Sequence, residues 1–115
     1  MNFLVILNHR PYDGTDVTWN ALRLASQAQK DGMSVRIFLM NDSVDLARRG
    51  LERGEDYDLQ NMLQEVIANG VEAKLCKTCI TRCGLGGSEM ITEVAIATMP
   101  ELAAWIADSE RVVTF

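Results

Sequence analysis

Three cysteines lie within eight residues of one another and are the residues of this chain best suited to covalent chemistry. A cysteine reacts as its thiolate, and nearby positive charge lowers the thiol pKa and so raises the thiolate fraction. Lys74, Lys77 and Arg82 lie in or beside this segment, and no Asp or Glu occurs between residues 73 and 88. Because the whole chain is acidic, with a net charge of −5, this local excess of positive charge indicates a reactive thiol site.

Cys76 is the cysteine that the pattern favours as the nucleophile. The run at residues 71–75 predicts a strand, so Cys76 follows at the junction of strand and loop. If the next residues form a short helix, Cys76 lies at its N-terminus, where free N–H groups stabilise a thiolate. We therefore expect Cys76 to be the most reactive thiol. Cys79 is the second candidate catalytic residue, and Lys77 and Arg82 are candidate binding residues.

The spacing Cys-x2-Cys-x3-Cys permits other interpretations. Cys76 and Cys79 form a C-x-x-C pair that can close as a disulfide. Three cysteines could also begin a zinc or iron–sulfur site, but a closed site needs a fourth ligand, and the only histidine, His9, is far away in the sequence. We therefore expect no metal and no other cofactor. For Cys79 and Cys83, a purely structural role as small apolar side chains stays open.

Runs of β-prone residues alternate with helical patterns along the chain. Strands are expected at residues 3–7, 34–40, 71–75, 94–97 and 111–115, and helices are expected to begin near residues 15–16, near 41–43, at 59 and after the capping-box pattern at 98–101. This alternation predicts one α/β domain over residues 1–115, with a parallel sheet covered by helices on both faces. Residues 48–58 are expected to form an exposed loop. Local patterns do not give the order of the strands.

The loop after the first expected strand holds further candidate site residues. Ligands of open parallel sheets bind at the carboxyl ends of the strands, and this loop and the cysteine segment both leave from that edge. His9, Arg10 and Tyr12 therefore could lie near the cysteines. We take His9 and Tyr12 as candidate binding residues, with His9 able to orient or protonate a sulfur substrate. An ordinary surface role for His9 stays open.

The charge and hydropathy of the chain exclude several classes of function. A net charge of −5 argues against binding to nucleic acid or to an anionic membrane surface, which both require a basic footprint. No stretch is long and apolar enough to cross a bilayer, and the short run at residues 3–7 lacks the flanks of a secretory signal. We therefore expect a cytoplasmic protein, in which clustered cysteines serve redox, sulfur-transfer or metal chemistry more often than structural disulfides.

The sequence resembles the DsrE/DsrF-like family of small sulfur-metabolism proteins, and within it the YchN-like members. The similar stretches are residues 20–25, 35–42, 60–63, 74–79 and 111–115, and their order and spacing carry the resemblance. The resemblance implies a three-layer α/β/α sandwich with a five-stranded, mainly parallel sheet. It also implies a homo-oligomer, a trimer or hexamer, with the cysteine region near the subunit contacts.

The resemblance also implies a role for individual cysteines. In sulfur-relay members, a cysteine after the third strand accepts sulfur as a persulfide and passes it on, and Cys76 aligns with it. Cys79 is shared with the YchN-like members, whereas Cys83 matches neither group. The implied function is a sulfur carrier or sulfurtransferase that works with donor and acceptor proteins. A redox-responsive Cys76–Cys79 dithiol and a non-catalytic oligomeric binding module are the alternatives.

Overall fold

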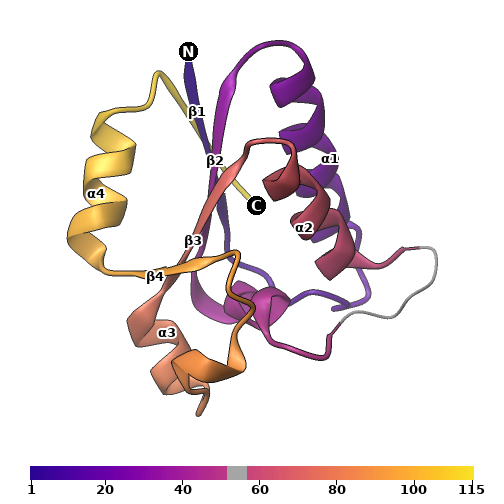
Figure 1. Cartoon of the computed structure of the whole chain (residues 1–115), viewed down its shortest axis with the longest axis vertical. Helices are drawn as coiled ribbons and strands as arrows, with labels where there is room; N and C mark the ends of the chain where they lie inside the picture. Colours follow the sequence, from indigo (N-terminus) through magenta and orange to yellow (C-terminus); the bar gives the residue numbers. More distant parts are fainter. Residues whose placement is uncertain (52–56) are drawn as a thin grey trace.

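Five strands form one parallel sheet in the computed structural model, which describes residues 1–51 and 57–115 (Figure 1). The strands are β1 (Asn2–Leu7), β2 (Ser34–Leu39), β3 (Glu72–Cys76), β4 (Ala95–Ala97) and β5 (Arg111–Thr114). Their order is β4-β3-β2-β1-β5, and each neighbouring pair is parallel. The expected α/β class is confirmed, and the sheet is parallel throughout rather than mainly parallel.

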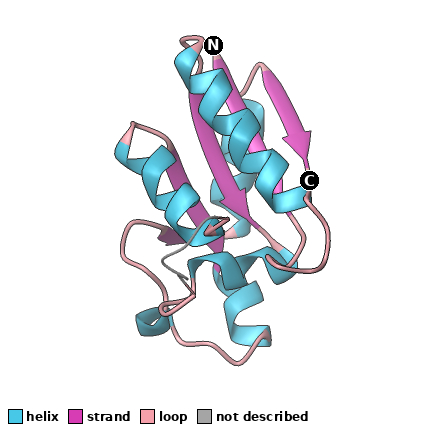
Figure 2. Cartoon of the chain, turned by 90° about the vertical axis from the view of Figure 1, so that its right-hand side faces the viewer, coloured by secondary structure: helices cyan, strands magenta, loops and turns pink. Residues whose placement is uncertain are grey.

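Helices cover both faces of the sheet, so the expected three layers are present. Helices α1 (Val17–Lys30) and α2 (Leu59–Ala68) lie together on one face, and α4 (Met99–Ala107) lies on the other (Figures 1 and 2). The short helices η1 (Asn41–Ala47), α3 (Lys77–Arg82) and η2 (Gly87–Glu89) lie at the carboxyl end of the sheet. None of the described helices is long and apolar enough to cross a membrane.

Apolar side chains from β1, β2 and β3 form the centre of the core. β1 is buried from its second residue to its last, as its unbroken apolar sequence predicts for a strand covered on both faces. Each fully buried aliphatic or aromatic side chain contributes about 1.5–3 kcal/mol to folding. The largest fully buried apolar side chains are Leu4, Val5, Leu7, Leu22, Ile37, Phe38, Leu39, Leu46, Leu59, Leu63 and Leu75.

Trp105 fixes α4 on its face of the sheet. Its ring meets Phe38 of β2 edge to face, with ring centroids 6.1 Å apart. The guanidinium of Arg36 lies 5.2 Å from the Trp105 ring centre, and the ammonium of Lys74 lies 4.7 Å from it. Both cations therefore make favourable cation–π contacts while their aliphatic stems cover the sheet.

The capping box predicted for α4 is present. The Glu101 carboxylate accepts a hydrogen bond from the Thr98 backbone N–H at 2.8 Å. In return, the Thr98 side chain accepts the backbone N–H of Glu101. The bond from the Thr98 N–H, together with the Lys74 ammonium 3.4 Å away, holds the pKa of Glu101 below its usual value. The local sequence pattern therefore sets where α4 begins.

Two loops differ from expectation or extend beyond what the structure describes. The helix expected near residues 41–43 is a 3₁₀ helix. The Ser43 hydroxyl lies 2.8 Å from the Leu7 carbonyl oxygen and 2.6 Å from that of Met40, so it shares its single proton between them and ties η1 to β1. Of the loop expected at 48–58, residues 52–56 lie outside the described residues. Its first residue, Arg48, pairs with Asp45 at 2.6 Å, so this end of the loop is tied to η1.

Candidate functional site

Cys76 lies where β3 ends and α3 begins, as the sequence predicts. Its backbone is extended, with φ −75° and ψ 117°, and its Sγ accepts the backbone N–H of Cys79 at 3.4 Å. The sulfur therefore takes the place of the oxygen that usually caps a helix. Only 6% of Cys76 is exposed, so little of this residue is accessible to solvent.

Cys79 is the third residue of α3 and is also buried, with 8% exposed. Its Sγ accepts the backbone N–H of Asn41 at 3.2 Å. Burial raises the pKa of the Cys79 thiol, and a hydrogen bond with the Cys76 thiol raises it further. The Asn41 N–H and the positive charge of Arg82 act in the opposite direction. The two cysteines are thus joined through the Cys79 backbone N–H and the Cys76 sulfur, and burial favours the protonated form of the Cys79 thiol.

Asn41 is the site residue that the sequence analysis missed as a neighbour of the cysteines. Its φ of +53° is in the left-handed region, which Asn tolerates better than most residues, and this conformation directs its N–H at Cys79. Its side-chain amide donates to the side-chain oxygen Oδ1 of Asn8 at 2.9 Å, and the Asn8 backbone N–H donates to the Phe115 carbonyl at 2.8 Å. The only available signal was position, because Asn41 follows a strand at the edge where ligands bind.

The two predicted cationic residues, Lys77 and Arg82, lie at opposite ends of α3. Lys77 and Arg82 are both exposed on this short helix. Arg82 is close enough for its charge to lower the pKa of Cys79, although burial outweighs it. Both side chains can attract an anionic sulfur species towards this edge of the sheet. Their role as binding residues stays a prediction.

The loop after β1 does reach the cysteine segment, through Arg10. A hollow of about 290 Å³ at this edge is lined by Arg10 and Cys83, together with Asp42, Asp45 and Leu85. Cys83 is the exposed thiol and ends α3. The expected approach of the two loops is therefore present. His9, next to Arg10, is exposed, and its role as a binding residue stays a prediction.

Tyr12, in the loop after β1, contacts the start of α2 through its side chain. Its hydroxyl donates to the Tyr57 carbonyl at 3.3 Å and accepts the Leu59 N–H at 2.9 Å. The backbone of Tyr12 turns at a left-handed φ of 59°, and the two hydroxyl contacts attach this turn to α2. The structure gives Tyr12 this anchoring contact, and its predicted part in substrate binding stays a prediction.

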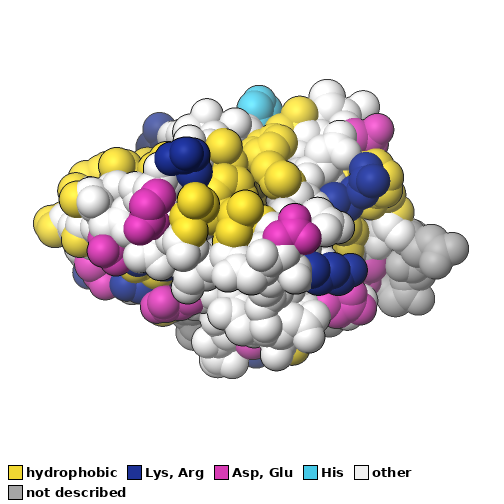
Figure 3. Space-filling model, turned by 90° about the horizontal axis from the view of Figure 1, so that it is seen from above, with side chains coloured by type: hydrophobic (Ala, Val, Ile, Leu, Met, Phe, Trp, Pro, Cys, Tyr) yellow, Lys and Arg dark blue, Asp and Glu magenta, His cyan; other side chains and the backbone are white. Residues whose placement is uncertain are grey.

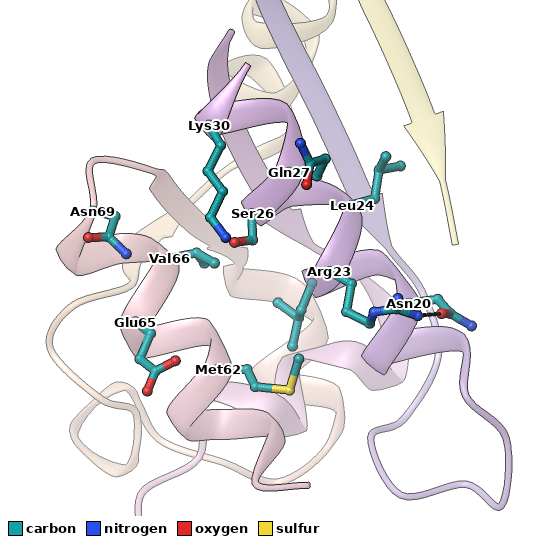
Figure 4. A pocket seen from close by; sticks show the side chains of 11 residues that line it. Asn20, Arg23, Leu24, Ser26, Gln27, Lys30, Met62, Glu65, Val66 and Asn69 are labelled. Atoms are coloured by element: carbon teal, nitrogen blue, oxygen red, sulfur yellow. Dashed lines mark hydrogen bonds between the residues drawn. The ribbon is translucent and has the colours of Figure 1, made fainter. Parts of the chain in front are cut away.

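Two further observations bear on other kinds of site. Within residues 1–51 and 57–115, no group of three or more His, Cys, Asp or Glu side chains is placed to hold a metal ion. A groove of about 530 Å³ lies between α1 and α2, on the face away from α4 (Figure 4). Arg23, Lys30 and Glu65 are among its lining residues, and no cysteine lines it. The three cysteines lie instead in and beside α3, at the carboxyl end of the sheet.

Comparison with known proteins places the chain in a family. The model of the DsrE/DsrF-like family matches residues 1–115. The chain belongs to the DsrE/DsrF-like family. It is 39% identical to protein YchN of Escherichia coli K12 over 114 residues, which cover 97% of each chain. It is 34% identical to the uncharacterized protein MJ0989 of Methanocaldococcus jannaschii over 115 residues, the whole of both chains.

Two solved structures match this fold. The crystal structure of YchN from E. coli matches with a TM-score of 0.87 and 36% identity, covering all of this chain and 99% of that one. The protein BT1422 of Bacteroides thetaiotaomicron, of unknown function, matches with a TM-score of 0.73 at 19% identity, over 98% and 94% of the two chains. The expected likeness to the DsrE/DsrF-like family and to its YchN-like members is confirmed.

Proposed function

We propose that this DsrE/DsrF-like protein carries sulfane sulfur as a persulfide on Cys76. The observation that carries the proposal is the position of Cys76 as the N-cap of α3, where its sulfur accepts the Cys79 N–H and two exposed cations, Lys77 and Arg82, lie on the same short helix. Family membership supports it, because sulfur-relay members use a cysteine at the position of Cys76.

The loading step is a thiol–persulfide exchange. The Cys76 thiolate attacks the outer sulfur of a donor persulfide R–S–SH, a new S–S bond forms, and the donor S–S bond breaks. The donor leaves as R–S⁻ and takes up the proton that Cys76 gave to solvent. Lys77 and Arg82 draw the anionic donor to this edge. The product is Cys76–S–SH, which can pass its outer sulfur to the thiolate of an acceptor protein.

Intact-mass analysis tests the loading step. Protein carrying Cys79→Ser and Cys83→Ser, in which Cys76 is the one remaining cysteine, is incubated with inorganic polysulfide, and excess reagent is removed. We expect the mass of one added sulfur atom, released by a thiol reductant. The matched control also carries Cys76→Ser and gains no sulfur. If the doubly substituted protein takes up no sulfur, the persulfide function is wrong.

A redox-responsive dithiol is the second candidate function. It is favoured by the 3.4 Å contact of the Cys79 N–H with the Cys76 sulfur, which places both cysteines in one helical turn. Such a pair can close as a disulfide with little backbone movement. Peptide mapping after mild oxidation should find a Cys76–Cys79 crosslink, with Cys83 outside it. A map in which Cys83 carries the crosslink would exclude this function.

We also propose that the protein assembles as a homo-oligomer, a trimer or hexamer, in the cytoplasm. The outward side of α4 supports this, because Met99 and Ile106 are 58% and 43% exposed and the other exposed residues of α4 are Ala and Pro. Hydrophobic side chains gather on the α4 side of the molecule in Figure 3. An exposed apolar patch of this kind often marks a surface that contacts another protein. Light scattering should give the molar mass of a trimer or hexamer. Ile106→Lys should lower this molar mass, whereas Leu24→Lys on α1 should leave it unchanged.

A further inference from the structure

Both sulfurs of the cysteine pair are buried, and this limits which thiol can take sulfur from Cys76. Cys76 is 6% exposed and Cys79 is 8% exposed. The thiol of an acceptor protein would have to reach a covered sulfur atom. Cys79 lies three residues further along the chain and donates its backbone N–H to the Cys76 sulfur at 3.4 Å. The nearest acceptor for a Cys76 persulfide is therefore within the chain.

Asn41 supplies a hydrogen-bond donor that stabilises the Cys79 sulfur when it attacks. An attacking thiol develops negative charge as it loses its proton, and burial opposes that charge. The Asn41 N–H is held 3.2 Å from the Cys79 sulfur, and it comes from η1 rather than from α3. It is fixed in place by the left-handed backbone of Asn41 and by the bond of its side chain to Asn8. A preorganised donor of this kind stabilises developing charge without rearrangement.

We propose that Cys79 discharges the persulfide of Cys76 as hydrogen sulfide. The Cys79 sulfur attacks Sγ of Cys76–S–SH, the Cys76–Cys79 bond forms, and the bond to the outer sulfur breaks. The outer sulfur leaves as HS⁻ and takes the Cys79 proton, so the products are one disulfide and one H₂S. The sulfane sulfur gains two electrons, which the two cysteine sulfurs lose. This inference rests on the proposed persulfide function.

The discharge step implies a substrate class and a second reactant. Burial of Cys76 favours a small donor, an inorganic polysulfide or a low-molecular-weight persulfide, over a protein donor. The disulfide formed in each cycle must be reduced before the next cycle, and a dithiol reductant supplies the two electrons. The protein then converts small persulfides to hydrogen sulfide at the expense of that dithiol.

Sulfide release and intact mass, measured together, test the inference. Fully reduced protein without free reductant is mixed with a limiting amount of inorganic polysulfide, and the sulfide formed is trapped with a bimane reagent. Wild-type protein and Cys83→Ser should release one equivalent of sulfide per loaded chain and lose two hydrogen atoms in mass. Cys79→Ser and Cys79→Ala should keep the added sulfur on Cys76 and release no sulfide by this route.

The outcomes separate this inference from the function on which it rests. If Cys79→Ser holds a persulfide and wild-type protein holds it equally long without forming a disulfide, the discharge step is wrong and the carrier function stands. If Cys79→Ser and Cys79→Ala take up no sulfur while circular dichroism shows both folded, the carrier function itself fails. A crosslink to Cys83 in the wild-type product would also overturn the assignment of Cys79.

Discussion

Asn41 donates its backbone N–H to the sulfur of Cys79 at 3.2 Å, across 38 positions of sequence. The contact exists because β2 and β3 are neighbours in the sheet, so the residue that follows β2 meets the helix that follows β3. The contact therefore joins η1, which carries Asn41, to α3, which carries Cys79.

The left-handed backbone of Asn41 predicts that glycine is more stable than alanine at this position. Asn41→Gly and Asn41→Ala both lose the side-chain bond to Asn8, but only Gly adopts a φ of +53° without strain. Asn41→Ala should therefore be less stable than Asn41→Gly by about 1 kcal/mol. Urea denaturation of the two proteins measures the difference. At Asn61, inside α2, the order should reverse, because Ala is the better helix former.

Burial of Cys79 predicts that stability falls at alkaline pH. The pKa of this thiol is raised by burial and by its bond with Cys76, whereas an unfolded thiol has a pKa of about 8.5. As the pH rises, the unfolded chain therefore loses its proton first, and the free energy of unfolding decreases until the pH passes the folded pKa.

Urea titrations between about pH 7 and pH 10 measure this decrease. Cys79→Ser should show a shallower decline than wild-type protein, and Cys83→Ser, which removes an exposed thiol, should follow the wild type. Equal slopes for all three proteins would contradict the raised pKa of Cys79.

Exposure predicts the order in which native thiols react with a bulky reagent. Cys83 is exposed, whereas Cys76 and Cys79 are buried. A maleimide carrying a polymer chain should label one cysteine rapidly, and peptide mapping should identify it as Cys83. Cys83→Ser should resist the same reagent until urea is added. The expectation that Cys76 is the most reactive thiol stays a prediction, and burial of Cys76 opposes it for a bulky reagent. Rapid labelling of Cys76 by this reagent would contradict the burial described.

The capping box of α4 predicts a measurable loss of stability. Thr98→Ala removes the side chain that caps the first turn and should lower the free energy of unfolding by about 0.5–2 kcal/mol. Thr92→Ala is the matched control, because Thr92 is an exposed threonine outside the described helices and strands. Urea denaturation of both proteins gives the comparison, and equal losses would argue that the cap contributes nothing.

Features with a local cause were predictable from the sequence. The capping box at Thr98 and the N-cap at Asp58, which accepts the Asn61 N–H at 3.0 Å, depend on residues three positions apart. The position of Cys76 between a strand and a short helix was predictable for the same reason. The apolar run of β1 indicated a strand buried on both faces.

Features that depend on strand order were not predictable. Asn41 looks like one of several cap residues in the sequence, and only the pairing of β2 with β3 brings it to Cys79. Burial of Cys79 follows from the same pairing, because η1 covers α3. Tyr12 lies at the same loop as His9, yet the turn at φ 59° directs it to α2. Side-chain direction in a loop is set by such turns, which the residue types of this loop do not reveal.

The bond from the Asn8 N–H to the Phe115 carbonyl has a practical consequence for anyone preparing this protein. Through Asn8 and Asn41, Phe115 is connected by hydrogen bonds to the Cys79 sulfur, so we expect a tag fused after residue 115 to disturb the donor that faces this thiol. Met1 lies at the opposite end of the sheet from α3 (Figure 1). Tags and fluorescent labels for thiol assays are therefore better attached ahead of residue 1.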